Sequence, residues 1–323
     1  MNPHRIALTS LVLVLASCLA QEPASESRPE VAVGRLICGG HLPLAVVEKK
    51  FQDDLTDFRL KTVQNHDWLD VIADMQSGKL VGTFILSPLA LKLIRDGLPA
   101  KIVLMADRNG NGFILSKRFA SIEALKGNNA VIAVPHLYSQ HHVLLHLALK
   151  QHGVSDREVT VIAMSPRDMI VSMQRGEIDG FMVGEPEGNR SLSLDNGWMA
   201  ATSPTIWRNH PDHLFLLSTA FIEQHPEQAQ ELISALRRAG QYIESHPHEA
   251  AVMGEDYTGA SAPIFEEVLT TPPEWIDYSE MIPSDEQIVA MANLMVEMGL
   301  WPDVPSDLGR YVDRRFILNA SGK

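Results

Sequence analysis

The chain has 323 residues, of which 45% are hydrophobic and 21% are charged. This composition is typical of a folded globular protein, and the length allows two domains of ordinary size. The net charge of −13 argues against nucleic acid as a partner, because phosphate binding needs clustered lysine and arginine.

Residues 1–17 have the features of a secretory signal peptide. A basic start is followed by a short, mostly apolar run that is too short to span a bilayer as a mature helix. The run ends in Leu-Ala-Ser-Cys at Cys18, which resembles the lipobox of bacterial lipoproteins. We therefore expect lipidation at Cys18, a flexible tether over residues 18–30, and a location on the periplasmic side of the cell envelope. A simple signal peptide cut nearby is the alternative.

Strands and helices alternate along the first part of the mature chain. Strands are expected at 31–38, 58–63, 80–86 and 101–106, with helices at 42–51, at 68–77 and from Ser87. The turn Gly39-Gly40-His41 places His41 at the carboxyl end of a strand, where open α/β sheets bind ligands. Residues 107–112 imitate an EF-hand loop, but Arg118 stands where calcium requires a glutamate. We interpret them as a turn that leaves the first lobe.

The alternation continues through a second lobe. Strands are expected at 130–135, 159–164, 178–183 and 198–203, with helices at 121–127, 142–152 and 168–176. A polar loop at 207–213 precedes a returning strand at 214–218, and helices follow Phe221. The pattern predicts a parallel sheet in each lobe. Lobe 1 would comprise residues 31–112 and 214–323, and lobe 2 residues 113–213.

One pattern occurs twice, 98 residues apart. DVIADMQSGKLVG starts at Asp70 and DMIVSMQRGEIDG at Asp168, and six of the thirteen positions are identical. The pairs Ser87-Pro88 and Glu185-Pro186 follow at similar places. We interpret the two stretches as equivalent helix–strand units of two similar lobes. In the second unit, Gly176 suits the end of the first helix, and Glu185 would cap a further helix that has Pro186 in its first position.

Three stretches carry a resemblance to a known family: IAVPHLYSQHH (132–142), SPRDMIVSMQRGEIDGFMVGEP (165–186) and IWRNHPDH (206–213). They resemble the nitrate- and bicarbonate-binding proteins of bacterial ABC importers, within the nitrate/sulfonate/taurine group. The resemblance implies a type II periplasmic-binding fold, with two doubly wound α/β lobes joined by a two-strand hinge and a ligand cleft between them. It also implies a solute-binding protein that captures a small anion or anion-bearing molecule by hinge closure and delivers it to an ABC permease and its ATPase.

The resemblance also implies site residues. His141 fits the place of a family histidine that holds the oxyanion, and Gly184 and Glu185 match a turn that lines the site. Nitrate binders have a lysine after the W-x-x-H-P motif, where this chain has His213. With that lysine absent, we expect histidines to supply much of the positive charge. The expected lining residues are His41, Ser87, His141, Gly184, Glu185 and His213.

Three alternatives stay open. A metal site would use His136, His141, His142 and His146, of which His142 and His146 have i,i+4 spacing on one predicted helix. A ligand sensor would signal to a partner protein instead of feeding a transporter. A binder of a pyrimidine precursor of thiamine would share the fold. We see no nucleophile joined to a base and an orienting group, so we expect no enzymatic activity. We also expect no cofactor, no metal ligand, membrane contact only through the lipid anchor, and a monomer.

Overall fold

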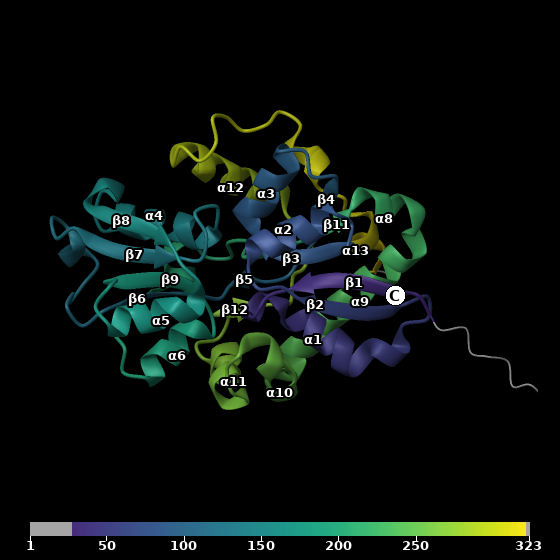
Figure 1. Ribbon diagram of the computed structural model, residues 1–323, viewed down its shortest axis with the longest axis horizontal. Helices are drawn as coiled ribbons and strands as arrows, with labels where there is room; N and C mark the ends of the chain where they lie inside the picture. Colours follow the sequence, from purple (N-terminus) through teal and green to yellow (C-terminus); the bar gives the residue numbers. More distant parts are fainter. Residues whose placement is uncertain (1–27, 321–323) are drawn as a thin grey trace, which may run out of the picture.

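The computed structural model describes residues 28–320, which form two α/β lobes side by side (Figure 1). The expected signal peptide and Cys18 lie outside the described residues. Among residues 28–320, no helix combines the length and the hydropathy needed to cross a membrane.

Lobe 1 is built on a five-stranded sheet with the order β2-β1-β3-β11-β4. Its strands span Arg59–Gln64 (β2), Glu30–Arg35 (β1), Gly82–Leu86 (β3), His213–Ser218 (β11) and Ala100–Met105 (β4). β1 is parallel to β2 and β3, whereas β11 is antiparallel to both of its neighbours. The sequence predicted only parallel strands. β11 runs in the opposite direction because the chain enters it from lobe 2.

The helices of lobe 1 cover both faces of this sheet. They span Leu42–Val46 (α1), Trp68–Gln76 (α2), Ser87–Arg95 (α3), Thr219–Gln224 (α8), Pro226–Ser245 (α9), Pro247–Thr258 (α10), Ala262–Thr270 (α11), Asp285–Glu297 (α12) and Arg315–Ala320 (α13). α2, α3 and α12 lie on one side of the sheet, and α1, α9 and α10 on the other (Figure 1). α1 continues as a π-helical segment over Val47–Phe51.

Lobe 2 repeats this plan with the strand order β10-β6-β9-β7-β8. Its strands span Trp198–Thr202 (β10), Asn111–Leu115 (β6), Gly180–Gly184 (β9), Ala130–Val134 (β7) and Val159–Ala163 (β8), and its helices span Gln140–Gln151 (α4), Pro166–Gln174 (α5), Glu187–Ser193 (α6) and Ser203–Ile206 (α7). β6 is the antiparallel strand here. The helix expected at 121–127 is only a single 3-10 turn, Glu123–Leu125.

The chain passes between the lobes just before β6 and again just before β11. At the first passage the short strand β5 (Arg108–Asn109) pairs with β12 (Ile276–Asp277), a segment from the C-terminal part of lobe 1. The second passage follows α7 and ends at His213, the first residue of β11.

The sequence repeat corresponds to a structural repeat. α5 and β9 have the bounds of α2 and β3 shifted by 98 residues, and β3 and β9 are both the central strands of their sheets. The residue after each central strand also makes the same contact. The Ser87 N–H donates to the Asp212 carbonyl at 3.1 Å, and the Glu185 N–H donates to the Gly110 carbonyl at 2.8 Å. Each acceptor immediately precedes the antiparallel strand of its lobe, so the units are equivalent in topology and in contacts.

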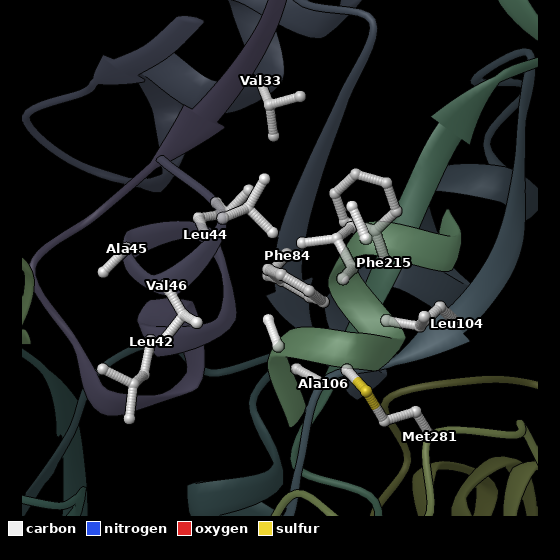
Figure 2. Packing of buried hydrophobic residues seen from close by; sticks show 14 of the residues in the cluster. Val33, Leu42, Leu44, Ala45, Val46, Phe84, Leu104, Ala106, Phe215 and Met281 are labelled. Carbon is white, nitrogen blue, oxygen red and sulfur yellow. The ribbon is translucent and has the colours of Figure 1, made fainter. Parts of the chain in front are cut away.

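The core of lobe 1 fixes the turn that carries His41. Leu44 of α1 packs toward Phe84 and Phe215 of the sheet, and all three side chains are fully buried (Figure 2). The two phenylalanine rings lie 4.8 Å apart. Burying a side chain of this size stabilises the fold by about 1.5–3 kcal/mol. Because α1 is held so firmly, the 3-10 turn Gly39–His41 before it has a defined place at the end of β1.

Candidate functional site

Polar side chains from both lobes meet between the two sheets, where solvent does not reach them. We call this group the interlobe cluster. Its buried members, each at most 3% exposed, are His41, Asp107, Asn111, Gln140, His141, Glu185, His210, Asp212 and His213. Cys38, which is half-buried, lies at its edge.

The two chain passages bring most of the cluster together. Asp107 follows β4 on the way out of lobe 1, and Asn111 begins β6 in lobe 2. Asp212 and His213 lie where the chain re-enters lobe 1. Gln140 begins α4, whose N-terminus is fixed by the Ser139 hydroxyl, which accepts from the His142 N–H at 3.2 Å.

Asp212 is the centre of the cluster, because its two oxygens contact different lobes. Oδ1 accepts from Gln140 Nε2 at 2.5 Å and from Asn111 Nδ2 at 2.8 Å, both in lobe 2. Oδ2 lies 2.7 Å from Nδ1 of His213, which belongs to lobe 1. One carboxylate therefore ties the two lobes together.

His213 is the cation of the cluster. Burial acts to lower the pKa of His213, but Asp212, Cys38 and Asp107 together outweigh it and hold the pKa well above its usual value. Burial also acts to raise the pKa of Asp212, and the His213 cation holds it below its usual value. Asp107 Oδ1 lies 3.4 Å from the same ring nitrogen, and burial together with Asp212 raises the pKa of Asp107 to about 6. The charge of His213 is therefore already compensated within the cluster.

Cys38 lies on the opposite side of the His213 imidazole from Asp212. Its Sγ lies 3.7 Å from Nε2 of His213, although the two residues are 175 positions apart in sequence. Cys38, His213 and Asp212 thus stand in the order of a nucleophile, a base and an orienting acid. No local motif joins residues so far apart, so the sequence did not reveal this arrangement.

His41 and His141 are both buried and neutral. Burial holds the pKa of His41 well below its usual value and lowers that of His141 to about 3. His41 Nε2 and both ring nitrogens of His141 have no hydrogen-bond partner among residues 28–320. The expectation that His141 supplies positive charge does not hold in this structure, since burial disfavours its charged form more than the Asp212 carboxylate favours it. These rings offer neutral hydrogen-bonding groups instead.

Glu185 has a divided role. Its Oε2 accepts from the Asn189 N–H of α6 at 2.9 Å, whereas Oε1 is buried without a partner in the described part of the chain. The N-cap of α6 is Pro186, one residue later than predicted, yet the Glu185 side chain still accepts from the helix N-terminus. Burial raises the pKa of Glu185 to about 8, so the carboxyl group is mostly protonated at neutral pH.

The remaining expected residues lie beside the cluster. A Cβ placed on Gly184 would lie 3.4 Å from His141 Nε2, so the glycine borders that ring. Ser87 is buried, and its hydroxyl donates to the Pro211 carbonyl at 3.0 Å. Ser87 is therefore bonded to the passage between the lobes.

The alternative metal site on α4 is wrong, because its histidines have separate partners. His146 Nδ1 lies 2.7 Å from Asp156 and its Nε2 lies 3.1 Å from Glu297. His142 Nδ1 contacts the Leu137 carbonyl at 2.8 Å, and His136 Nδ1 accepts from the Tyr138 N–H at 2.9 Å. Only His141 of this group belongs to the interlobe cluster.

Sequence reasoning missed several members of the cluster: Cys38, Asp107, Asn111, Gln140, His210 and Asp212. A usable signal was present. The stretches DRNGN and HPDH are unusually polar for segments that adjoin buried strands, and both were placed where the chain changes lobe. Polar residues at a passage between lobes face the cleft, and this rule would have selected most of them.

A hollow of about 440 Å³ also opens on the surface near the hinge. It is lined by residues that include Arg108, Trp207 and Asp277 and by none of the members of the interlobe cluster. The cluster unites both lobes and contains most of the buried polar side-chain atoms that lack a partner in the described part of the chain, so we assign the candidate site to the cluster.

Comparison with known proteins places this chain in a family. The sequence profile of the NMT1-like family matches residues 24–254. The nitrate import ATP-binding protein NrtC of Synechocystis sp. is 26% identical over 65% of this chain, and the match spans only 34% of that longer protein. The taurine-binding periplasmic protein of Escherichia coli is 26% identical over 76% of this chain and 80% of its own length.

A solved structure has the same fold. The ligand-binding component of an ABC-type import system from Staphylococcus aureus, determined with zinc bound, aligns with a TM-score of 0.84 at 20% identity. The alignment covers 92% of this chain and all of that one. The predicted fold class, two α/β lobes of the periplasmic-binding type, is confirmed. The matched profile covers well over half of the residues, and the chain belongs to the NMT1-like family.

Proposed function

We propose that this protein is an extracytoplasmic, lipid-anchored solute-binding protein that captures a small anion-bearing molecule between its lobes. Closure of the lobes would enclose the ligand, and a monomer would deliver it to an ABC permease and its ATPase. One observation carries the proposal: both lobes contribute buried polar atoms that lack partners within residues 28–320. Buried polar groups are normally hydrogen-bonded, so a trapped ligand would satisfy them.

The unpaired atoms indicate the chemistry of the ligand. Asn111 and Gln140 each direct an amide nitrogen to Asp212, which can only accept, so their free atoms are the acceptors Oδ1 and Oε1. His41 Nδ1 accepts from the Leu36 N–H at 3.2 Å, which leaves its proton on Nε2 as a free donor. The ligand would therefore both accept and donate hydrogen bonds.

The charges of the cluster argue against a bare anion such as nitrate. The His213 cation is matched by Asp212, and Asp107 with a pKa of about 6 adds negative charge at neutral pH. A molecule that joins an anionic group to an ammonium group fits better. Its anion would meet the histidine donors, and its ammonium group would meet the amide oxygens. The similarity to a taurine-binding protein supports this class of aminosulfonates and related zwitterions.

A thermal-shift screen of the purified protein tests the proposal. The panel would contain nitrate, bicarbonate, simple alkanesulfonates and their amino-substituted analogues. We expect the amino-substituted compounds to stabilise the fold, by about 2.7 kcal/mol when the ligand is at one hundred times its Kd. His141→Ala should abolish the shift, whereas His142→Ala, the next residue on α4, should retain it. A panel without any stabilising zwitterion, or an equal response to nitrate, would overturn the assignment.

Delivery is tested separately in cells. If the protein feeds a transporter, deleting its gene should abolish uptake of the identified ligand at low concentration. Normal uptake in the deletion strain, with loss of a ligand-dependent response, would identify a sensor instead.

A further inference from the structure

One corner of the interlobe cluster brings a thiol and two imidazoles together at the end of β1. Cys38, His41 and His213 each offer one ligating atom, and these three atoms lie within 4.8 Å of one another. The Cys38 sulfur and His213 Nε2 are 3.7 Å apart. In a tetrahedral zinc site, with Zn–S about 2.3 Å and Zn–N about 2.0–2.1 Å, a sulfur and a nitrogen ligand are about 3.6 Å apart. The two atoms are therefore already spaced to share one metal ion.

The surroundings of His213 match those of a metal-binding histidine. Such a ring usually directs its second nitrogen to a carboxylate, which fixes the orientation of the ring and keeps the metal-facing nitrogen available. Here Nδ1 lies 2.7 Å from Asp212 Oδ2, and Nε2 faces the sulfur. In the cationic ring Nε2 carries a proton, so a metal ion bound there would displace that proton. Trp68 stacks on the ring with an interplanar angle of 29°. A Cβ on Gly40 would lie 2.2 Å from Nδ1, so only glycine lets this turn approach the imidazole.

His41 is the weaker third ligand of the group. Its Nδ1 accepts from the Leu36 N–H, so metal binding at Nε2 would require the ring proton to move and that contact to break. The cost of this change should make the contribution of His41 smaller than that of Cys38.

We propose that Cys38 and His213, assisted by His41, bind a soft or borderline transition-metal ion, Zn²⁺ or Cu⁺, on the lobe 1 side of the cleft. Thiolate and imidazole ligands select these ions over Mg²⁺ and Ca²⁺, which prefer oxygen. Three protein ligands would leave a fourth position open toward lobe 2. The proposal does not depend on the identity of the organic ligand, because all three residues belong to lobe 1.

The experiment is a metal titration of the purified full chain after removal of metals. Zn²⁺ would be titrated in competition with a chromophoric chelator, and Co²⁺ would serve as a spectroscopic substitute that absorbs strongly when bound to a thiolate. We expect one equivalent of metal, a thiolate-to-cobalt band, and at least a tenfold loss of affinity in Cys38→Ser. His41→Asn should lose less. Cys18→Ser, which changes the other cysteine of the chain, should bind as the wild type does.

Cys38→Ser replaces a half-buried thiol with a hydroxyl of similar size, so the variant should fold, and circular dichroism would verify this. Zn²⁺ binding of equal affinity in Cys38→Ser, or the absence of the cobalt band in the wild type, would overturn the proposal. Failure to bind Zn²⁺, combined with faster alkylation of Cys38 by iodoacetamide than of free cysteine, would also overturn it and identify a nucleophile instead. None of these results bears on the organic ligand, which the thermal-shift screen tests independently.

Discussion

Replacing Glu185 with glutamine should make the protein less sensitive to alkaline pH. Burial raises the pKa of this carboxyl group from 4.5 to about 8. The unfolded chain therefore releases the proton at a lower pH than the folded protein does. The group's contribution to stability is fully present below pH 4.5 and is lost as pH rises toward 8. Glutamine keeps the shape and carries no charge, so Glu185→Gln should not show this loss.

The size of the effect follows from the shift. Between the two pKa values, stability changes by about 1.4 kcal/mol for each pH unit and each group. Because the slope is smaller close to each pKa, the wild type should lose about 3–4 kcal/mol relative to the variant from pH 5 to pH 8. Glutamine can still accept from the Asn189 N–H, so the contact with α6 should persist.

Urea unfolding at pH 5, 6, 7 and 8 would measure this difference without ligand, with tryptophan fluorescence as the signal. The matched control is Glu223→Gln, which changes an exposed carboxylate on α8 and should leave the pH dependence as it is. Parallel stability curves for the wild type and Glu185→Gln would refute the reasoning, because they would mean that Glu185 titrates alike in the folded and unfolded states.

Three further predictions concern the hinge and the anchor. Asp212→Asn removes the partner of the His213 cation, and breaking a buried ion pair costs about 3–5 kcal/mol, so the urea midpoint should fall markedly. Gly39→Ala should hold the lobes apart, because its Cβ would lie 2.5 Å from the Glu185 backbone oxygen, and X-ray scattering should show less compaction with ligand. Cys18→Ala should move the protein from the detergent phase to the aqueous phase.

Each of these has a clear contrary result. An unchanged urea midpoint in Asp212→Asn would mean that the ion pair does not stabilise the fold. For Gly39→Ala, the control is Gly309→Ala, where an added Cβ meets no atom within 4 Å. Equal compaction in both glycine variants would contradict the prediction. Aqueous partitioning of the wild type would remove the case for a lipid anchor.

The fold was largely predictable because its information is local. Gly176 has a φ of +69° just after α5, as a helix end requires, and Ser284 caps α12 through its contact with the Gln287 N–H. The repeat at Asp70 and Asp168 predicted two equivalent units, and their bounds differ by the predicted 98 residues. The antiparallel direction of β6 and β11 was not predicted, since it depends on the lobe from which the chain enters each strand.

The site was less predictable because its chemistry depends on pairs that are distant in sequence. His141 and His213 are both histidines in polar stretches, yet one is neutral and the other is charged. The difference is that Oδ2 of Asp212 lies 2.7 Å from His213, whereas burial dominates at His141. Only the folded chain shows which histidine receives the carboxylate, so the expectation of an anion held by charged histidines could not be corrected from sequence.

If the lobes close on a ligand as we propose, the same carboxylate would link binding to motion. In this structure Asp212 accepts from Gln140 and Asn111 of the other lobe, so the opening motion that we propose would break both hydrogen bonds. Closing without a ligand leaves buried atoms of His41, His141 and other members of the cluster unpaired, at about 1–3 kcal/mol for each group. In the proposed closure, these costs would oppose the bonds to Asp212 and bring the open and closed states closer in free energy. A ligand that pairs with those atoms binds only the closed form well, and this differential affinity is what can shift the equilibrium toward closure.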